Sequence, residues 1–193
     1  MTTSFYQPQE LAELGLKSYG KNVLISRKCS IYGASNISIG NNVRIDDFCV
    51  LSGKIEIGNF VHIGAASLLF GGEYGIIMKD FSGLSSRCAV YAMSDEYSGE
   101  CIANAMIPDE FRNVYGGQVT IEKHAGTGTG CTILPGVKIG EGSVVGAMSL
   151  VMTNIKPWGI YLGSPPRKLD DRDKKVLSLE KELLARYLDK EKE

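Results

Sequence analysis

The chain has 193 residues, with 21 lysines and arginines against 22 aspartates and glutamates. This length suits one domain with a substantial core. The balanced charge argues against nucleic acid or an anionic membrane as the main partner. No apolar run approaches membrane-spanning length, and residues 1–8 have neither the basic nor the apolar region of a signal peptide. We therefore expect a cytoplasmic protein without a membrane span.

Residues 1–20 form a lead-in in which residues 9–17 are predicted to be a short helix. The next segment carries aliphatic residues at a spacing of six, which is neither the helical period nor the strand period. A six-residue period is typical of β-helix repeats, with one short strand and one corner per repeat. The phase slips near residues 37–39 and 71–75, which indicates longer corners there. The first series is Ile39, Ile45, Leu51, Ile57 and Ile63.

Residues 91–117 interrupt the period with a long polar insertion that contains several aromatic residues. A long insertion in a repeat scaffold is usually functional or disordered, and the aromatic residues favour an ordered loop. The six-residue series then resumes, so residues 21–166 are predicted to form one β-helix domain. The second series is Ile121, Thr127, Ile133, Ile139, Val145 and Val151.

Residues 167–193 are predicted to contain a charged C-terminal helix, from about Asp170 to Lys190. Val176, Leu179, Leu183 and Tyr187 recur at helical spacing, so one stripe of the helix can pack against the domain. We expect this helix to cap the open end of the solenoid.

The five cysteines are odd in number and form no CxxC pair. They support neither a disulfide framework nor a cysteine-rich zinc site, and we predict no metal. Cys49 and Cys131 occupy repeat positions that suit a small apolar residue, so both are expected to be buried, reduced thiols.

Three segments carry a resemblance to a known family: ILPGVKIG at 133–140, VVGAMSLV at 144–151 and GSPPRKL at 163–169. They resemble the hexapeptide-repeat acyltransferases, which include the galactoside, maltose and xenobiotic acetyltransferases and enzymes of surface-polysaccharide biosynthesis. The resemblance implies an all-β, left-handed parallel β-helix that forms a homotrimer. It also implies that acetyl-CoA, as co-substrate, binds between subunits. The implied reaction is acylation of a hydroxyl or amine of a sugar or nucleotide-sugar.

The chain departs from that family at two places. Gly126 and Thr127 stand where the family often has a bulky aromatic residue and an aliphatic one. Thr127 thereby places a hydroxyl on an inward position, where it needs a hydrogen-bond partner. The catalytic histidine of the family lies in the inserted loop near the phase of Ser94 and Asp95, but this loop contains no histidine.

The two histidines are His62 and His124. His62 precedes the inward Ile63, so strand alternation points it outward, to solvent or to a groove between subunits. Imidazole titrates in the range that a general base needs, which makes His62 the first candidate for the base. A structural role in a subunit interface is the alternative. His124 falls at a corner, where we expect a solvated side chain.

Acidic and aromatic residues of the inserted loop are the candidates for acceptor binding. Asp95 is the second predicted catalytic residue, because its carboxylate can orient His62 of a neighbouring chain or bind a cationic sugar amine. Glu100 and Tyr97 are predicted to contact the substrate. An acidic loop that hydrogen-bonds its own backbone is the alternative.

Small residues at outer corners leave room for the pantetheine arm of the co-substrate. These are Gly128, Gly130, Gly146 and Ala147. Arg167 and Lys168 follow a Pro-Pro pair and, by the resemblance, are expected to meet the phosphates of coenzyme A. A solvated linker is the alternative for both.

A β-helix without this enzymology is the competing hypothesis. It would be a non-catalytic assembly protein or a relative of the γ-carbonic anhydrases. A zinc hydratase of that kind needs three histidines around its metal, whereas this chain has two, far apart in sequence.

Overall fold

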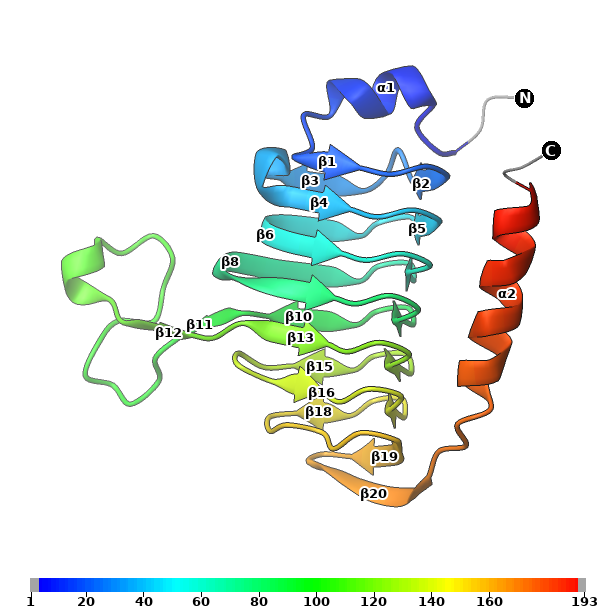
Figure 1. The fold of residues 1–193 in the computed structure, drawn as a ribbon. Helices are drawn as coiled ribbons and strands as arrows, with labels where there is room; N and C mark the ends of the chain where they lie inside the picture. Colours follow the sequence, from blue (N-terminus) through cyan, green and yellow to red (C-terminus); the bar gives the residue numbers. More distant parts are fainter. Residues whose placement is uncertain (1–3, 191–193) are drawn as a thin grey trace.

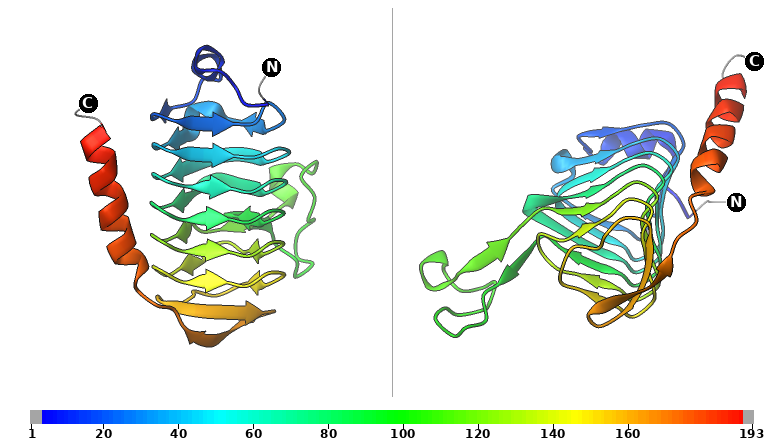
Figure 2. Two further views of the ribbon diagram at one scale, coloured as in Figure 1. Left: turned by 90° about the vertical axis from the view of Figure 1, so that its right-hand side faces the viewer. Right: turned by 60° about the horizontal axis from the view of Figure 1, so that its bottom comes forward.

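The protein is a left-handed parallel β-helix, as the resemblance implied. A computed structural model describes residues 4–190, and side chains up to residue 187. Short strands stack coil upon coil around one core, and each coil turns through three faces (Figures 1 and 2). Among the described residues, no helix is long and apolar enough to cross a membrane.

The first face is a sheet whose strands follow chain order, parallel up to β19 and closed by the antiparallel β20. Parallel pairing places Arg44 beside His62, and His62 beside Gly83. Each residue of this face therefore lies next to a residue from the coil before and the coil after. The strands are β2 (Val23–Ile25), β5 (Val43–Ile45), β7 (His62–Ile63), β9 (Gly83–Leu84), β14 (Gly126–Thr127), β17 (Val144–Val145), β19 (Gly159–Gly163) and β20 (Pro166–Asp171).

The second and third faces are joined by β6 and β8, which are long enough to run along both. The second face also contains β3 (Ser30–Tyr32), β10 (Ala89–Tyr91), β15 (Thr132–Ile133) and β18 (Leu150–Val151). The third face also contains β1 (Ser18–Tyr19), β4 (Ile37–Ile39), β13 (Val119–Ile121) and β16 (Lys138–Ile139). The two joining strands are β6 (Val50–Ile57) and β8 (Leu68–Met78).

The six-residue series forms the core. Every member of both series is buried, from Ile39 to Val151, because strand alternation directs these positions inward in each coil. Each fully buried aliphatic side chain contributes roughly 1.5–3 kcal/mol to folding. Thr127 is the polar member, and its hydroxyl lies 3.3 Å from the Sγ of Cys88, which supplies the predicted partner.

The three interruptions of the period fall on one edge, between the second and third faces. The first contains the short 3₁₀ helix η1 (Ala34–Asn36), and the second is the bulge of β8 around Gly72. The third is the long insertion, in which β11 (Met93–Asp95) and β12 (Val114–Gly116) pair as an antiparallel hairpin with η2 (Asp109–Phe111) beyond it. This inserted loop projects far from the body of the molecule (Figure 1, left).

The helices differ in detail from the sequence prediction. Helix α1 (Pro8–Glu13) lies over the N-terminal end of the β-helix and is shorter than predicted, since Gly15 has a left-handed φ of 70°. Helix α2 (Val176–Lys190) begins later than predicted, because residues 166–171 form β20 instead. The predicted end cap is wrong: α2 runs along the side of the β-helix, beside the edge between the third and first faces (Figures 1 and 2).

Candidate active site

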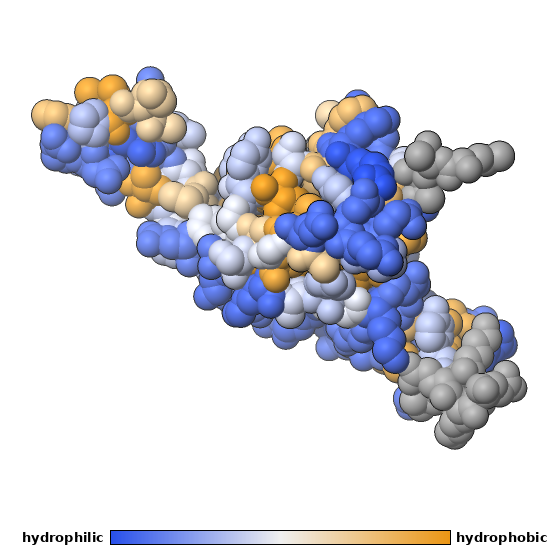
Figure 3. Space-filling model, turned by 90° about the horizontal axis from the view of Figure 1, so that it is seen from above, coloured by the Kyte–Doolittle hydropathy of each residue, from blue (hydrophilic) through white to orange (hydrophobic). Residues whose placement is uncertain are grey.

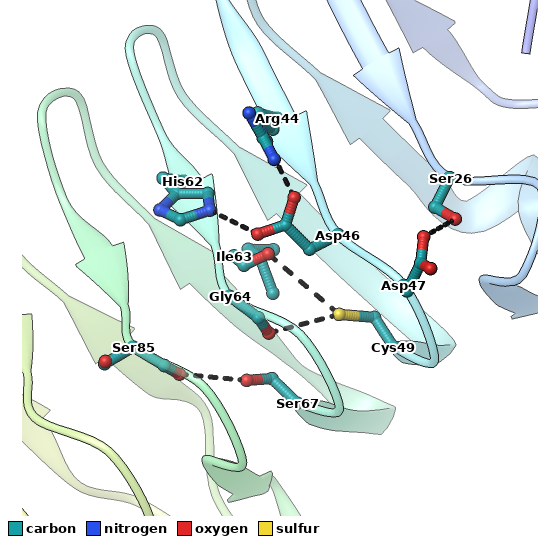
Figure 4. A network of polar contacts seen from close by, with 10 residues as sticks. All are labelled: Ser26, Arg44, Asp46, Asp47, Cys49, His62, Ile63, Gly64, Ser67 and Ser85. Atoms are coloured by element: carbon teal, nitrogen blue, oxygen red, sulfur yellow. Dashed lines mark hydrogen bonds and ion pairs between the residues drawn. The ribbon is translucent and has the colours of Figure 1, made fainter. Parts of the chain in front are cut away.

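His62 points outward from the first face and pairs with a carboxylate of the preceding coil (Figure 4). Its Nε2 lies 2.8 Å from Oδ2 of Asp46, and Nε of Arg44 donates to Oδ1 of the same carboxylate at 2.7 Å. A carboxylate can only accept hydrogen bonds, so Nε2 of His62 carries the proton. Its Nδ1 is then left with a free lone pair, which is the form that a general base requires.

The carboxylate of Asp46 is held in its charged form. Partial burial by itself would raise the pKa of Asp46, but the hydrogen bonds from His62 and Arg44 outweigh burial and lower that pKa below the usual range. The Asp46 side chain is 18% exposed, while that of His62 is 56% exposed. The pair therefore presents an accessible imidazole whose partner is largely covered.

A shallow hollow of about 630 Å³ lies beside this pair on the first face. Glycines form much of its surface, and hydroxyl groups lie along the edge that joins the first face to the second. Oγ of Ser86 and Oγ1 of Thr129 are 2.8 Å apart there. The hollow is lined by Asp46, His62, Gly64, Ala65, Gly83, Leu84, Ser85, Ser86, Gly126, Thr127, Gly128 and Val144.

The glycines predicted to border the co-substrate occupy this same edge. Gly128 lines the hollow, but it also has a packing role, because a Cβ there would lie 2.5 Å from the backbone N of Ala147. A Cβ on Gly146 would lie 2.6 Å from Cδ1 of Leu162, and Gly130 has a left-handed φ of 71°. Close stacking of coils thus explains Gly128, and backbone conformation explains Gly130, as well as a ligand does.

The predicted phosphate contacts lie on the C-terminal hairpin. Arg167 pairs with Leu162 across β19 and β20, and Lys168 pairs with Tyr161. Both side chains are exposed. Lys168 forms an ion pair with Asp171, whereas the guanidinium of Arg167 makes no hydrogen bond or ion pair with the part of the chain that the structure describes. The free cation on this hairpin is therefore Arg167.

The loop residues are remote from His62 within one chain. Asp95 ends β11 and accepts a hydrogen bond from Nη2 of Arg112 at 2.9 Å, a partner that the sequence did not suggest. The hydroxyl of Ser94 donates to the Tyr97 hydroxyl at 3.3 Å, and the Glu100 side chain is exposed. Because none of these residues lines the hollow, one chain does not join the two predicted catalytic residues.

His124 corrects a prediction. It is 5% exposed rather than solvated, because α2 covers its corner. Its Nε2 lies 2.8 Å from Oε2 of Glu180, and its ring stacks on Phe81 with centroids 5.1 Å apart. His124 therefore anchors the helix and is not available to a substrate.

The cysteines follow the prediction of buried thiols. Cys49 and Cys131 are fully buried, and all five cysteines are free. The thiol of Cys131 contacts the carbonyl oxygen of Gly146 at 3.1 Å. Burial raises the pKa of the Cys29 thiol to about 12, where it cannot serve as a nucleophile at neutral pH.

Asp46 is the residue that the sequence reasoning missed. It belongs to the coil before His62, and the parallel register that pairs Arg44 with His62 brings it within reach. The repeat itself carried that signal, because three hexapeptides make one turn of the β-helix and so place residues about one turn apart side by side. Ser85, Ser86 and Gly83 enter the site for the same reason, one coil later.

Comparisons with known proteins identify relatives of this chain. Residues 36–71 match the model of the bacterial transferase hexapeptide, a family of six repeats. The chain is 42% identical over 174 residues to dTDP-4-amino-4,6-dideoxy-D-glucose acyltransferase of Escherichia coli, covering 89% of this chain and 90% of the relative. It is 30% identical over 120 residues to a chloramphenicol acetyltransferase of Klebsiella aerogenes, a match that covers 62% of this chain and 52% of the relative.

Solved structures give a closer comparison. The N-acyltransferase AntD of Bacillus cereus, in complex with dTDP and 3-hydroxybutyryl-CoA, is 50% identical and superposes with a TM-score of 0.94, covering 96% of this chain and 99% of that chain. A variant of the same enzyme was solved with dTDP-4-amino-4,6-dideoxyglucose and coenzyme A, at a TM-score of 0.93. Its variants replace a serine or an aspartate ten positions further along.

Proposed function

This chain belongs to the hexapeptide-repeat acyltransferases, and we propose that it acylates the 4-amino group of a dTDP-4-amino-4,6-dideoxy sugar. The broader activity, transfer from an acyl-CoA to a sugar or nucleotide-sugar, follows from its family. A non-catalytic or carbonic-anhydrase-like β-helix is thereby set aside. The observation that carries the proposal is the 50% identity, over 96% of the chain, to an enzyme solved with this acceptor and coenzyme A.

The spacing of two residues supports the same acceptor. Ser85 and Asp95 are the serine and aspartate of this sequence that stand ten positions apart, as do the two residues varied in the relative. Ser85 lines the hollow beside His62, and Asp95 carries the loop carboxylate that was predicted from the sequence. We assign Asp95 to the sugar amine, from which its carboxylate accepts a hydrogen bond, with Tyr97 and Glu100 as further acceptor contacts.

The His62–Asp46 pair can then manage the proton of the reaction. The acyl-CoA supplies a thioester carbonyl that an amine attacks, forming a C–N bond as the C–S bond breaks. Nδ1 of His62 takes the proton that the attacking amine loses and gives it to the departing thiolate of coenzyme A, while Asp46 stabilises the imidazolium in between. The hydroxyl of Ser85 can donate to the developing oxyanion. Gly128, Gly130, Gly146 and Ala147 flank the pantetheine in this assignment.

A homotrimer would complete the site. The hairpin of β11, which ends at Asp95, leaves the edge between the second and third faces (Figure 2). The hollow lies on the first face, so in this proposal a neighbouring chain brings Asp95 to it. The loop carries exposed hydrophobic residues far from the body, including Met106 at 88% and Ile102 at 54% (Figure 3). Closed three-fold symmetry covers such a surface on every subunit.

Light scattering on the purified chain tests the assembly. The expected mass is three times the 20.9 kDa of the chain. A monomer at micromolar concentration contradicts both the trimer and the shared site.

Arg167 is assigned to the phosphates of coenzyme A, with Lys168 in a lesser role because Asp171 already pairs with it. A phosphate contact far from the thioester acts equally on ground and transition states. Arg167→Ala should therefore raise KM for the acyl-CoA by a factor that corresponds to about 1–2 kcal/mol, with kcat largely unchanged. The effect should shrink as salt rises. An unaltered KM at low salt would indicate that Arg167 is a solvated hairpin residue that does not contact coenzyme A.

The acceptor is tested with two nucleotide-sugars that differ at one position. With an acyl-CoA donor, dTDP-4-amino-4,6-dideoxyglucose should yield an N-acylated product by mass spectrometry and free coenzyme A by thiol titration. dTDP-6-deoxyglucose, which has a hydroxyl at C4, is the matched control, and the enzyme should acylate it far more slowly. Equal transfer to both sugars, or none to the amine, contradicts the proposal.

The cellular setting is part of the same proposal. Acylated amino sugars on a nucleotide carrier are donors for glycan assembly, which supports a place in surface-polysaccharide biosynthesis. Five free cysteines agree with the reducing cytoplasm as its location. Trapping of the thiols in intact cells with an alkylating reagent, with and without prior reduction, tests this location.

A further inference from the structure

The glycines of the first face and its edges fall into two classes. At Gly40, Gly64 and Gly128 an added Cβ would lie 2.5–2.7 Å from backbone atoms of the next coil, so close stacking requires glycine. At Gly83 and Gly126 the nearest atom would lie 3.4 Å away, which is ordinary van der Waals contact, and neither residue has a left-handed φ. Packing and backbone conformation therefore leave these two glycines unexplained.

Gly83 and Gly126 occupy the outward row beside His62. His62 pairs in register with Gly83, Gly83 with Gly126, and Gly126 with Val144. All four residues line the hollow, so the two missing side chains create it. Glycine inside a strand weakens the strand, and where packing does not demand it, glycine marks the close approach of another group.

The floor that these glycines form suits carbon rather than polar groups. The amide of Gly83 already donates to the carbonyl oxygen of Ala125 at 3.1 Å, and that of Gly126 donates to Ser143 at 3.0 Å. Neither donor is free for a sugar hydroxyl or a phosphate. The wall beyond Gly126 is the aliphatic Val144, while the imidazole of His62 and the carboxylate of Asp46 lie on the opposite side.

We propose that Gly83 and Gly126 are specificity-determining residues that admit an acyl group longer than acetyl. This inference rests on the acyl transfer proposed above, because it assigns the hollow beside His62 to the acyl end of the donor. Between His62 and Val144 the outward row carries no side chain, which leaves room beyond what an acetyl group needs. A side chain at either position would occupy the space of the acyl carbons beyond the carbonyl group. It would leave the carbonyl group itself in place.

The experiment compares two donors with one acceptor. Wild-type protein should use butyryl-CoA at least as efficiently as acetyl-CoA with the dTDP-amino sugar. Gly126→Val should lower kcat/KM for butyryl-CoA about tenfold or more relative to acetyl-CoA, since a filled pocket excludes a methylene or two by that factor. Gly83→Ala should show the same preference to a smaller degree. Leu24→Ala, in the same outward row but outside the hollow, is the control and should leave the donor ratio unchanged.

A stability measurement separates this role from packing. Gly126→Ala should keep or raise Tm, because alanine fits the backbone conformation and lowers the conformational entropy of the unfolded chain. Gly128→Ala should lower Tm strongly, because its Cβ meets backbone.

Three outcomes would overturn the inference: an equal loss for both donors, a rise in KM for the sugar alone, and loss of the native oligomer in Gly126→Val. If the wild-type protein used neither donor, the proposed function itself would fail first.

Discussion

The two histidines lie in two regions of the β-helix, and each pairs with a carboxylate, but their exposure to solvent differs. His62 and His124 each place Nε2 2.8 Å from a carboxylate oxygen. The His62 side chain is 56% exposed on the open first face, whereas that of His124 is 3% exposed beneath α2. Asp46 comes from the adjacent coil, and Glu180 comes from a helix far along the chain.

The difference shows that the hydrogen bond alone does not define a site. An imidazole with a fixed tautomer and a free, exposed nitrogen can accept a proton from a substrate. The same imidazole under a helix contributes a tether instead. Loss of the first pair should therefore affect turnover, and loss of the second should affect stability.

The largest expected effect is that of His62→Asn, which keeps polarity and approximate size but removes the titratable group. If His62 is the base, kcat should fall by roughly 10²–10⁴-fold with little change in affinity for the acyl-CoA. Steady-state kinetics together with a melting curve check this. An unchanged kcat would show that His62, like His124, has no role in turnover. It would favour transfer to an amine that arrives deprotonated and needs no base.

A smaller effect is expected for Asp46→Asn. Nδ1 of His62 would still be present, but the ring would lose the carboxylate that fixes its tautomer and orientation. We expect kcat to fall by on the order of 10- to 100-fold, because small errors in position carry that cost. KM for both substrates should stay near the wild-type value. A loss of affinity without a loss of turnover would show that Asp46 binds substrate directly.

Glu180→Gln tests the second region. It leaves buried His124 without its charged partner and releases Lys123, whose Nζ lies 2.6 Å from Oε1 of Glu180. The expected loss is about 1–3 kcal/mol of unfolding free energy, with kcat unchanged. Glu182→Gln on the same helix, at an exposed ion pair, is the control and should change little. A comparable loss in the control would argue that α2 is not held by His124.

The smallest expected effect is on the loss of thermal stability at acidic pH. Burial would raise the pKa of Glu180, but hydrogen bonds from Lys123 and His124 lower it more, so the pKa lies below its ordinary value of 4.5. A depressed carboxyl pKa stabilises the fold fully above the unfolded value, and this stability is lost as pH falls through the folded pKa. Tm between about pH 6 and pH 3 should therefore fall less steeply in Glu180→Gln than in wild type. Parallel curves would contradict this assignment.

Much of the fold was predictable because the β-helix repeats a local rule. The period of six placed Ile39 to Val151 inside and His62 outside, and it also identified Thr127 as a hydroxyl in need of a partner. The course of α2 was not predictable. Its apolar stripe fits an end or a side equally well, and strand pairing of residues 166–171 with β19 fixed its starting point.

The candidate site divides in the same way. His62 was predicted from strand alternation and Asp95 from its place in the loop, whereas Asp46, Ser85 and the glycine pair were not predicted. Those residues meet His62 across coils, where the number of residues per turn varies with the insertions at one edge. Gly83 and Gly126 are 43 positions apart along the chain but adjacent in register, because the inserted loop lies between them.

The sequence by itself determined the repeat, the inward residues and the class of chemistry, since these depend on periods and motifs within a few residues. The tertiary structure decided which carboxylate each histidine receives and which glycines are free of packing demands. Those outcomes depend on register between distant coils and on where a helix docks. Burial then separates an exposed candidate base from a buried anchor, although both histidines make the same kind of hydrogen bond.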